Sequence, residues 1–255
     1  MDDTVPEALR SLLSGYDGLA VAFSGGTDST YLLYAARECG VRVRAYTVRS
    51  GFQPRSETGL AVRTAGMLGA EQRLIDIDVL SDTSITSNPE DRCYLCKNLI
   101  FSTIISCAST DGFDTVADGT NASDDPSGRP GMRALGELGV VSPLRICGIT
   151  KQQVRELSRR AGLETWNMPS NSCLATRIPH GMAITKELLE RTERAEEELR
   201  TLGLRGFRVR TTDSGARLET TAADSGLLGS KRSLVEEILL KYYPSVSYSE
   251  RKPAP

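Results

Sequence analysis

A glycine-rich segment followed by hydroxyl and carboxylate side chains is the first part of the chain that could do chemistry. Residues 24–30 read Ser-Gly-Gly-Thr-Asp-Ser-Thr, and an apolar helical pattern follows them. The glycines let a ligand approach the backbone without a Cβ in the way. The first turn of the helix would direct its unpaired N–H groups and positive dipole end toward that ligand. We therefore predict an anion site, most simply for phosphate; the spacing and lysine of a Walker A loop are absent.

Three cysteines form the second group of reactive side chains. Cys93 and Cys96 make a CxxC pair, and Cys173 follows in an irregular segment rich in proline and glycine. Zinc takes four ligands, and the single histidine of the chain, His180, lies seven residues after Cys173, directly behind Pro179. An iron–sulfur cluster held by three cysteines would leave one iron open for sulfide. The CxxC pair alone fits a structural, redox or metal-binding role equally well.

The elements around the glycine-rich segment predict a doubly wound α/β fold. Apolar or alternating runs at 18–23, 41–48, 73–77 and 113–117 predict strands, and helical patterns separate them. This alternation implies a parallel sheet with right-handed crossovers. A short fifth strand is expected at 140–144. Ligands of open parallel sheets bind at the carboxyl ends of strands, where Gly119 and Thr120 also fall.

The remainder of the chain predicts a smaller α+β domain. We place a boundary near residue 180, with residues 1–180 forming the larger domain and 181–255 the smaller one. A charged helix from Thr185 to about residue 202 precedes two strands at 207–210 and 216–219. Arg208 and Arg210 alternate onto one strand face, so both guanidiniums could bind a phosphate or carboxylates, or form a solvated basic face. Glu196, within a run of three glutamates, is expected on a solvated helix face.

Composition excludes several classes of protein. The 255 residues are 39% hydrophobic and 25% charged, with a net charge of −2, which gives no general attraction to nucleic acid. The chain shows neither a secretory signal nor an apolar run of about 20 residues, so we expect a protein without a membrane anchor. Six cysteines without such a signal favour reduced thiols and a cytoplasmic location.

Several of these strings resemble known families. Residues 24–30 resemble the SGGxDS signature of the PP-loop ATP pyrophosphatases, which cleave ATP to AMP and pyrophosphate. Nearly the whole chain resembles the LarE sulfur transferases of nickel-pincer cofactor biosynthesis. The matching segments are 21–30, 88–97, 118–121, 129–131, 165–181 and 207–219. Because Cys93, Cys96 and Cys173 are all present, the sequence resembles the LarE subgroup with a [4Fe–4S] cluster.

The LarE resemblance implies an ATP-dependent sulfurtransferase that forms AMP and pyrophosphate. It would adenylate a carboxylate of pyridinium-3,5-biscarboxylic acid mononucleotide and convert it to a thiocarboxylate. Sulfur would come from sulfide or another donor through the cluster, or from Cys173 itself. The resemblance also implies a homo-oligomer, such as a hexamer.

The same resemblance assigns roles to individual positions. Asp28 would act in adenylation with Mg²⁺, and Cys173 in sulfur transfer. Binding of ATP and substrate falls to residues of the glycine-rich segment, of the loop after the fourth strand, and of the arginines. These are Ser24, Gly25, Gly26, Asp28, Ser29, Gly119, Thr120, Arg177, Arg208 and Arg210; Cys93, Cys96 and Cys173 would bind the cluster.

Two other functions compete with sulfur transfer to a small carboxylate. Some PP-loop enzymes that thiolate tRNA also hold a cluster with CxxC and a later cysteine, but the net charge and the 173–181 string argue against this function. Steep weakening of tRNA binding by salt would favour it. The third alternative is an ATP-sensing binding module, which would bind ATP without releasing pyrophosphate and needs no cysteines.

Overall fold

The computed structural model describes residues 4–125, 130–169 and 172–251, which form two compact units. Unit 1 comprises residues 1–50, 55–77 and 91–168, and unit 2 comprises 51–54, 78–90 and 169–255. The chain therefore enters unit 2 three times. The expected division into residues 1–180 and 181–255 stays a prediction. Among the described residues, no helix combines the length and apolarity needed to span a bilayer.

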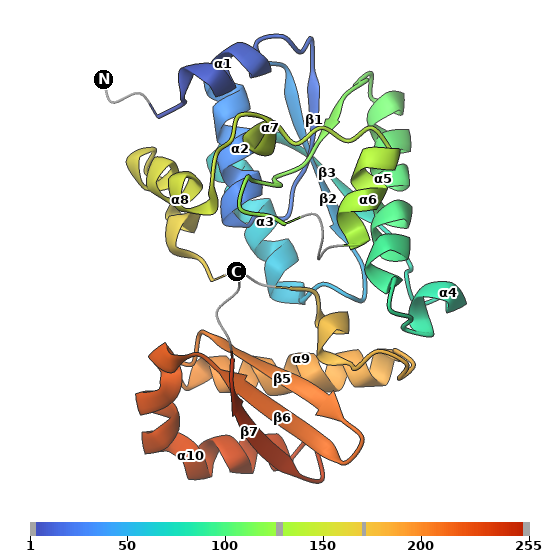
Figure 1. Cartoon of the computed structure of the whole chain (residues 1–255), viewed down its shortest axis with the longest axis vertical. Coiled ribbons are helices and arrows are strands. Elements are labelled where there is room, and N and C mark those ends of the chain that lie inside the picture. Colours follow the sequence, from blue (N-terminus) through green and yellow to red (C-terminus); the bar gives the residue numbers. More distant parts are fainter. Residues whose placement is uncertain (1–3, 126–129, 170–171, 252–255) are drawn as a thin grey trace. The chain divides into compact units, whose positions relative to one another are not determined.

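Unit 1 is a three-layer α/β structure, as the alternating pattern predicts. Its sheet has the strand order β3-β2-β1-β4, and all three pairings are parallel. Helices α1, α2, α3 and α8 cover one face, and α5 and α6 cover the other (Figure 1). The strands are β1 (Leu19–Ala22), β2 (Val43–Arg49), β3 (Glu71–Asp76) and β4 (Val116–Ala117). The helices are α1 (Glu7–Leu13), α2 (Thr27–Glu38), α3 (Arg55–Met67), α5 (Arg92–Thr110), α6 (Pro130–Glu137), α7 (Pro143–Ile146) and α8 (Lys151–Arg160).

The prediction of a fifth strand at 140–144 is wrong. Only one parallel bridge, between Ala117 and Val141, extends the sheet at this point, and α7 begins at Pro143. Proline suits the first position of a helix, where its missing N–H has no partner to lose. Proline cannot donate to a strand ladder, so the local chemistry favours the helix.

The buried face of α3 is formed by small residues. The larger apolar side chains Val62 and Met67 are 42% and 67% exposed, whereas Ala61 and Ala65 are buried. Small residues are needed on this face because a Cβ on Gly25 would lie only 2.7 Å from the Cα of Ala61. The close approach of α3 to the glycine-rich loop therefore selects alanine over the bulkier residues.

Unit 2 has a three-stranded sheet of order β5-β6-β7, antiparallel between β5 and β6 and parallel between β6 and β7. Alternate residues of β5 are buried, and Val209 and Leu218 pack into a core with the two long helices. Its strands are β5 (Phe207–Thr212), β6 (Gly215–Thr220) and β7 (Val246–Glu250). Its helices are α4 (Thr83–Thr86), η2 (Leu174–Arg177), α9 (Lys186–Thr201), η3 (Ala222–Asp224) and α10 (Ser225–Leu240); η1 (Glu164–Asn167) belongs to unit 1.

Asn88 ties the early segment of unit 2 to the irregular segment before α9. It is fully buried with φ 60°, and its amide nitrogen donates to Pro179 O at 2.7 Å and Met182 O at 3.0 Å. The peptide N–H of Gly181 donates to Asn88 O at 2.9 Å. Asparagine tolerates the left-handed region better than most residues, and here its side-chain amide also donates to two carbonyls of the irregular segment.

Candidate functional site

The glycine-rich loop lies between the end of β1 and the start of α2, at the carboxyl edge of the sheet. Gly25 has φ 73°, and the hydroxyls of Ser24 and Ser29 lie 3.2 Å apart across the turn. Gly26 is the N-cap of α2, where no side chain caps the helix. The first N–H groups of α2 therefore keep their capacity to bind an anion.

A second glycine brings the loop after β4 against the start of α2. A Cβ on Gly119 would lie 2.8 Å from the backbone nitrogen of Ser29, so only glycine fits there. The neighbouring Asp118 is 6% exposed and accepts hydrogen bonds from Ser142 Oγ at 2.6 Å and Thr120 N at 3.2 Å. Thr120 also donates its hydroxyl to Asp118. Asp118 thus orders the turn that holds Gly119 beside the glycine-rich loop.

Asp28 is bound by a lysine that the sequence reasoning missed. Lys151 Nζ lies 2.5 Å from Asp28 Oδ2, and Asn121 Nδ2 donates to Asp28 Oδ1 at 3.3 Å. Burial raises the pKa of the Asp28 carboxyl, while the Lys151 ammonium opposes this rise. Lys151 is the first residue of α8, and Thr150 with Gln153 makes a full capping box there. The capping box could have pointed to a fixed side chain at position 151, but only folding brings it to Asp28.

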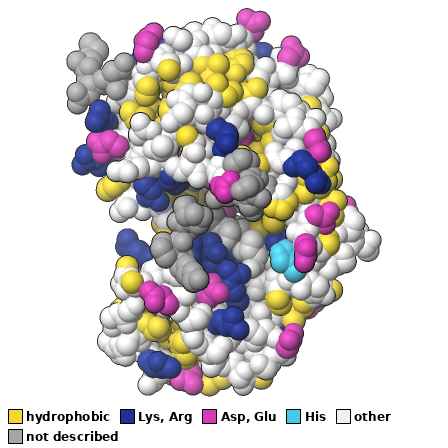
Figure 2. Space-filling view, viewed as in Figure 1, with side chains coloured by type: hydrophobic (Ala, Val, Ile, Leu, Met, Phe, Trp, Pro, Cys, Tyr) yellow, Lys and Arg dark blue, Asp and Glu magenta, His cyan; other side chains and the backbone are white. Residues whose placement is uncertain are grey.

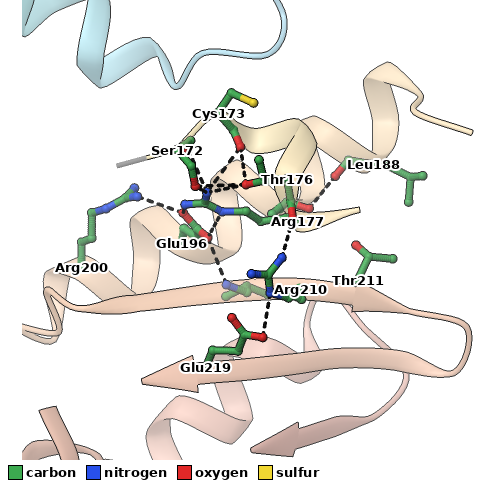
Figure 3. A network of polar contacts seen from close by, with 12 residues as sticks. Ser172, Cys173, Thr176, Arg177, Leu188, Glu196, Arg200, Arg210, Thr211 and Glu219 are labelled. Carbon is green, nitrogen blue, oxygen red and sulfur yellow. Dashed lines mark hydrogen bonds and ion pairs between the residues drawn. The ribbon is translucent and has the colours of Figure 1, made fainter. Parts of the chain in front are cut away.

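Unit 2 contains a polar network around the Cys173 segment (Figure 3). Arg177 Nε and Nη2 donate to the two carboxylate oxygens of Glu196 at 2.9 and 3.1 Å, and the side chains are 3% and 0% exposed. Glu196 also accepts from the backbone N–H of Val209 at 3.0 Å. The expectation that Glu196 lies on a solvated face is wrong, because α9 turns this residue toward β5.

The same arginine holds the backbone around Cys173. Arg177 Nη1 donates to Ser172 O at 2.8 Å and to Thr176 Oγ1 at 3.1 Å, and Cys173 O lies 3.4 Å away. The sulfur of Cys173 points away from this network (Figure 3). With its donors used inside unit 2, Arg177 positions the turn that presents the thiol.

Arg210 and Arg208 differ in their environments, although they are two residues apart on β5. Arg210 Nε lies 2.7 Å from Glu219 Oε1, and Arg210 Nη1 donates to Thr176 O at 2.6 Å. Arg208 has no hydrogen bond or ion pair within the described ranges. Burial lowers the pKa of Arg208 to about 10, and the charges of Arg251, Arg177 and Arg210 add to this effect. Of the two, only Arg210 is engaged by partners among the described residues of unit 2.

Comparisons with known proteins identify the family of the chain. A protein of Lactiplantibacillus plantarum named pyridinium-3,5-bisthiocarboxylic acid mononucleotide synthase is 33% identical over 225 residues, which cover 88% of this chain and 82% of that protein. The chain belongs to the LarE family of PP-loop proteins. An uncharacterized protein of Synechocystis is 37% identical over 214 residues, covering 84% of this chain and 80% of that protein.

Two further comparisons place this LarE-family chain among PP-loop folds. The family model described as queuosine biosynthesis protein QueC matches residues 19–130, which hold the glycine-rich loop and the CxxC pair. The structure of NMN synthetase from Francisella tularensis superposes with a TM-score of 0.50 and 19% identity, covering 64% of this chain and 72% of that one. This likeness concerns the fold alone and agrees with the parallel sheet of unit 1.

The cysteines of this LarE-family chain are divided between its units. Cys93 and Cys96 lie one turn apart near the start of α5, which begins at Arg92. Cys173 precedes η2 in unit 2. Within the described ranges, no group of three His, Cys, Asp or Glu residues lies close enough to hold a metal. His180 Nδ1 lies 3.0 Å from Pro89 O.

The donor chemistry nevertheless fits a soft metal centre. Thiolates are the usual ligands of iron–sulfur clusters, and two of the three are on one helical turn. Arg92 is 3% exposed, and its Nη2 lies 3.7 Å from Cys93 Sγ. The other cysteines, including Cys107 on α5 and Cys147 after α7, lie outside this set.

Proposed function

We propose that this protein is an ATP-dependent sulfur transferase that makes a thiocarboxylate from a carboxylate of pyridinium-3,5-biscarboxylic acid mononucleotide, for nickel-pincer cofactor biosynthesis. The observation that carries the proposal is the relationship, over 88% of the chain, to a protein named as the synthase of the bisthiocarboxylic acid mononucleotide. The glycine-rich loop of unit 1 and the Cys173 segment of unit 2 supply the two halves of the chemistry.

In the first half, a substrate carboxylate oxygen attacks the α-phosphorus of ATP and pyrophosphate leaves. The start of α2, with Ser24, Gly25, Gly26 and Ser29, binds the departing phosphates through N–H and hydroxyl groups. Lys151 adds a positive charge at the same place. Asp28 would hold Mg²⁺, since a carboxylate together with substrate phosphates is the usual ligand set of that ion. Gly119 and Thr120 border the place of the adenylate.

In the second half, a sulfur nucleophile attacks the acyl carbon of the adenylate and AMP leaves. Adenylation is needed because a free carboxylate is a poor electrophile. Arg177 and Glu196 fix the turn that presents the Cys173 thiol. Cys93, Cys96 and Cys173 would hold a [4Fe–4S] cluster, which when bound supplies an iron position for exogenous sulfide. We further infer a homo-oligomer from the family resemblance.

Reconstitution tests the proposed reaction. Purified protein is incubated anaerobically with MgATP, sulfide and the biscarboxylic acid mononucleotide, and AMP, pyrophosphate and thiocarboxylate are measured by chromatography and mass spectrometry. We expect equal amounts of AMP and thiocarboxylate, and none with Cys173→Ala. Pyrophosphate release that is independent of the mononucleotide and yields no thiocarboxylate would overturn the proposal.

The cluster is tested separately by iron and sulfide analysis after anaerobic purification. We expect iron and sulfide in the wild type, strong loss in Cys93→Ser, and no loss in Cys107→Ser, a matched change on the same helix. An iron-free protein that binds only zinc would overturn the cluster. Loss of one H₂S from Cys173 after turnover would instead identify Cys173 as the sulfur donor.

A further inference from the structure

One face of the sheet in unit 2 carries arginines of β5 and of the segment that follows β7. In the backbone register of the sheet, Arg208 of β5 lies opposite Glu219 of β6, and Glu219 lies opposite Ser249 of β7. Side chains alternate along strands, so these three residues share a face opposite the buried Val209. Arg251 follows two residues after Ser249, and its N–H donates to Thr220 O at 2.8 Å, which continues the pairing. Figure 2 shows Lys and Arg side chains gathered over unit 2.

Two arginines near this face already have partners within unit 2. Arg210 is bound to Glu219 and to the carbonyl of Thr176, and Arg177 is bound to Glu196. Each of these carboxylates therefore already balances a neighbouring charge. Arg210 and Arg177 hold the local structure together and have little capacity left for a ligand.

Among the residues that the structure describes, Arg208 and Arg251 have no such partners. Neither guanidinium has a hydrogen bond or ion pair within the described ranges, although both side chains are partly buried. Burial lowers the pKa of each, as do the positive charges of Arg177 and Arg210, while Glu219 opposes these effects. Partly desolvated like charges held together without counter-charge raise the free energy of the fold. A bound anion would offset this cost.

We propose that Arg251 joins Arg208 in binding the phosphate monoester of the mononucleotide substrate, and that Arg210 positions this pair without binding the ligand. The inference rests on the proposed function for the identity of the ligand. A guanidinium presents two parallel N–H donors to phosphate oxygens, and two guanidiniums can balance the dianion of a monoester. The sheet supplies the spacing, because β5 and the segment after β7 flank the same β6 residue pair, Glu219 and Thr220.

The adenylate also carries a phosphate, so the test must distinguish binding of that phosphate from binding of the phosphate of the mononucleotide. Calorimetric titrations of the full chain use nicotinic acid mononucleotide, its riboside without phosphate, and AMP. For Arg251→Gln we expect the Kd of the mononucleotide to rise about tenfold or more, as for the loss of a charged hydrogen bond. For Arg251→Lys we expect a smaller rise in the Kd of the mononucleotide. The riboside, which lacks the phosphate, should bind the wild type and Arg251→Gln with the same Kd.

Arg205→Gln is the matched control. Arg205 is an exposed arginine three residues before Arg208, and its replacement removes the same charge from unit 2. An unchanged Kd for the mononucleotide in this variant would separate a local contact from general charge attraction. Circular dichroism checks that each variant is folded, and an Arg208→Gln/Arg251→Gln double-mutant cycle should show coupling between the two residues.

Several results would overturn the role of Arg251. The first is that the mononucleotide does not bind the wild type, and the second is that its Kd is the same in Arg251→Gln as in the wild type. The others are that Arg251→Gln weakens binding of the riboside as much as that of the mononucleotide, or weakens binding of AMP alone. Binding is measured without turnover, so the two proposals fail separately. If the mononucleotide requires Arg251 but yields no thiocarboxylate, the phosphate site stands and the proposed function fails.

Discussion

Arg177 and Glu196 form a buried ion pair in which both guanidinium–carboxylate contacts are 3.1 Å or shorter. The pair joins η2 to α9, and Glu196 extends it to the backbone of β5 through Val209 N. Three elements of unit 2 therefore meet at one carboxylate. Because Arg177 also holds Ser172 O and Thr176 Oγ1, the conformation of the Cys173 turn depends on this pair.

Glu196→Ala should destabilise unit 2 by about 3–5 kcal/mol, because it leaves a buried guanidinium without counter-charge. Hydrogen exchange of the Val209 amide is the direct measurement, since this N–H loses its acceptor. Arg177→Met combined with Glu196→Leu should recover part of the stability, because apolar replacements leave no buried charge. Unchanged protection of Val209 in Glu196→Ala would contradict the structural role of the pair.

Lys151→Met should lower kcat/KM for ATP by about 10- to 100-fold, the usual effect of losing one charged contact. Lys151 lies at 2.5 Å from Asp28, beside the uncapped start of α2, where the pyrophosphate would leave. Steady-state pyrophosphate release measures the effect. Lys186→Met removes an exposed lysine from the start of α9 and should leave the rate unchanged. A role for Lys151 in phosphate binding is excluded if both variants behave like wild type.

Gly119→Ala should weaken ATP binding at least about tenfold, which corresponds to about 1.4 kcal/mol. A methyl group there would meet Ser29 N at 2.8 Å and push the β4 loop away from the start of α2. Gly136→Ala on α6 is the control, because its Cβ would meet nothing within 4 Å and alanine favours helices. Titration with a non-hydrolysable ATP analogue gives both dissociation constants. Equal affinities in the two variants would show that the close approach does not form the ATP site.

Asp111→Asn should lower the free energy of unfolding at neutral pH, and this difference from the wild type should disappear in acid. Hydrogen bonds from Arg73, Tyr46 and Arg44 lower the pKa of Asp111 to about 2. A lowered pKa means that the unfolded chain binds the proton more readily, so the stabilisation exists above pH 3.8 and disappears as pH falls through 2. Urea midpoints of wild type and variant, compared between pH 7 and pH 2, should therefore converge. A constant difference across this range would exclude the ionised carboxylate as the cause.

Much of unit 1 follows from local patterns in the sequence. The capping box of Thr150 with Gln153, the left-handed Gly162 after α8 and the parallel strands on either side of α2 agree with propensities that act over a few residues. The Ser-Gly-Gly-Thr-Asp-Ser string likewise predicts a turn and an anion site, because the backbone geometry is set within the string. Proline chemistry, also local, explains why α7 replaces the expected strand.

Partners distant in the chain depend on folding. Lys151 reaches Asp28 across 123 residues, and Glu196 leaves the expected solvated face because α9 rotates it toward Arg177. Arg208 and Arg210 look equivalent in the sequence, yet Glu219 on the neighbouring strand engages only Arg210 in an ion pair. Residue types and their spacing determine which chemistry is available, whereas burial and counter-charge depend on which surfaces pack together. Packing is a property of the whole fold, and it separates binding residues from structural ones.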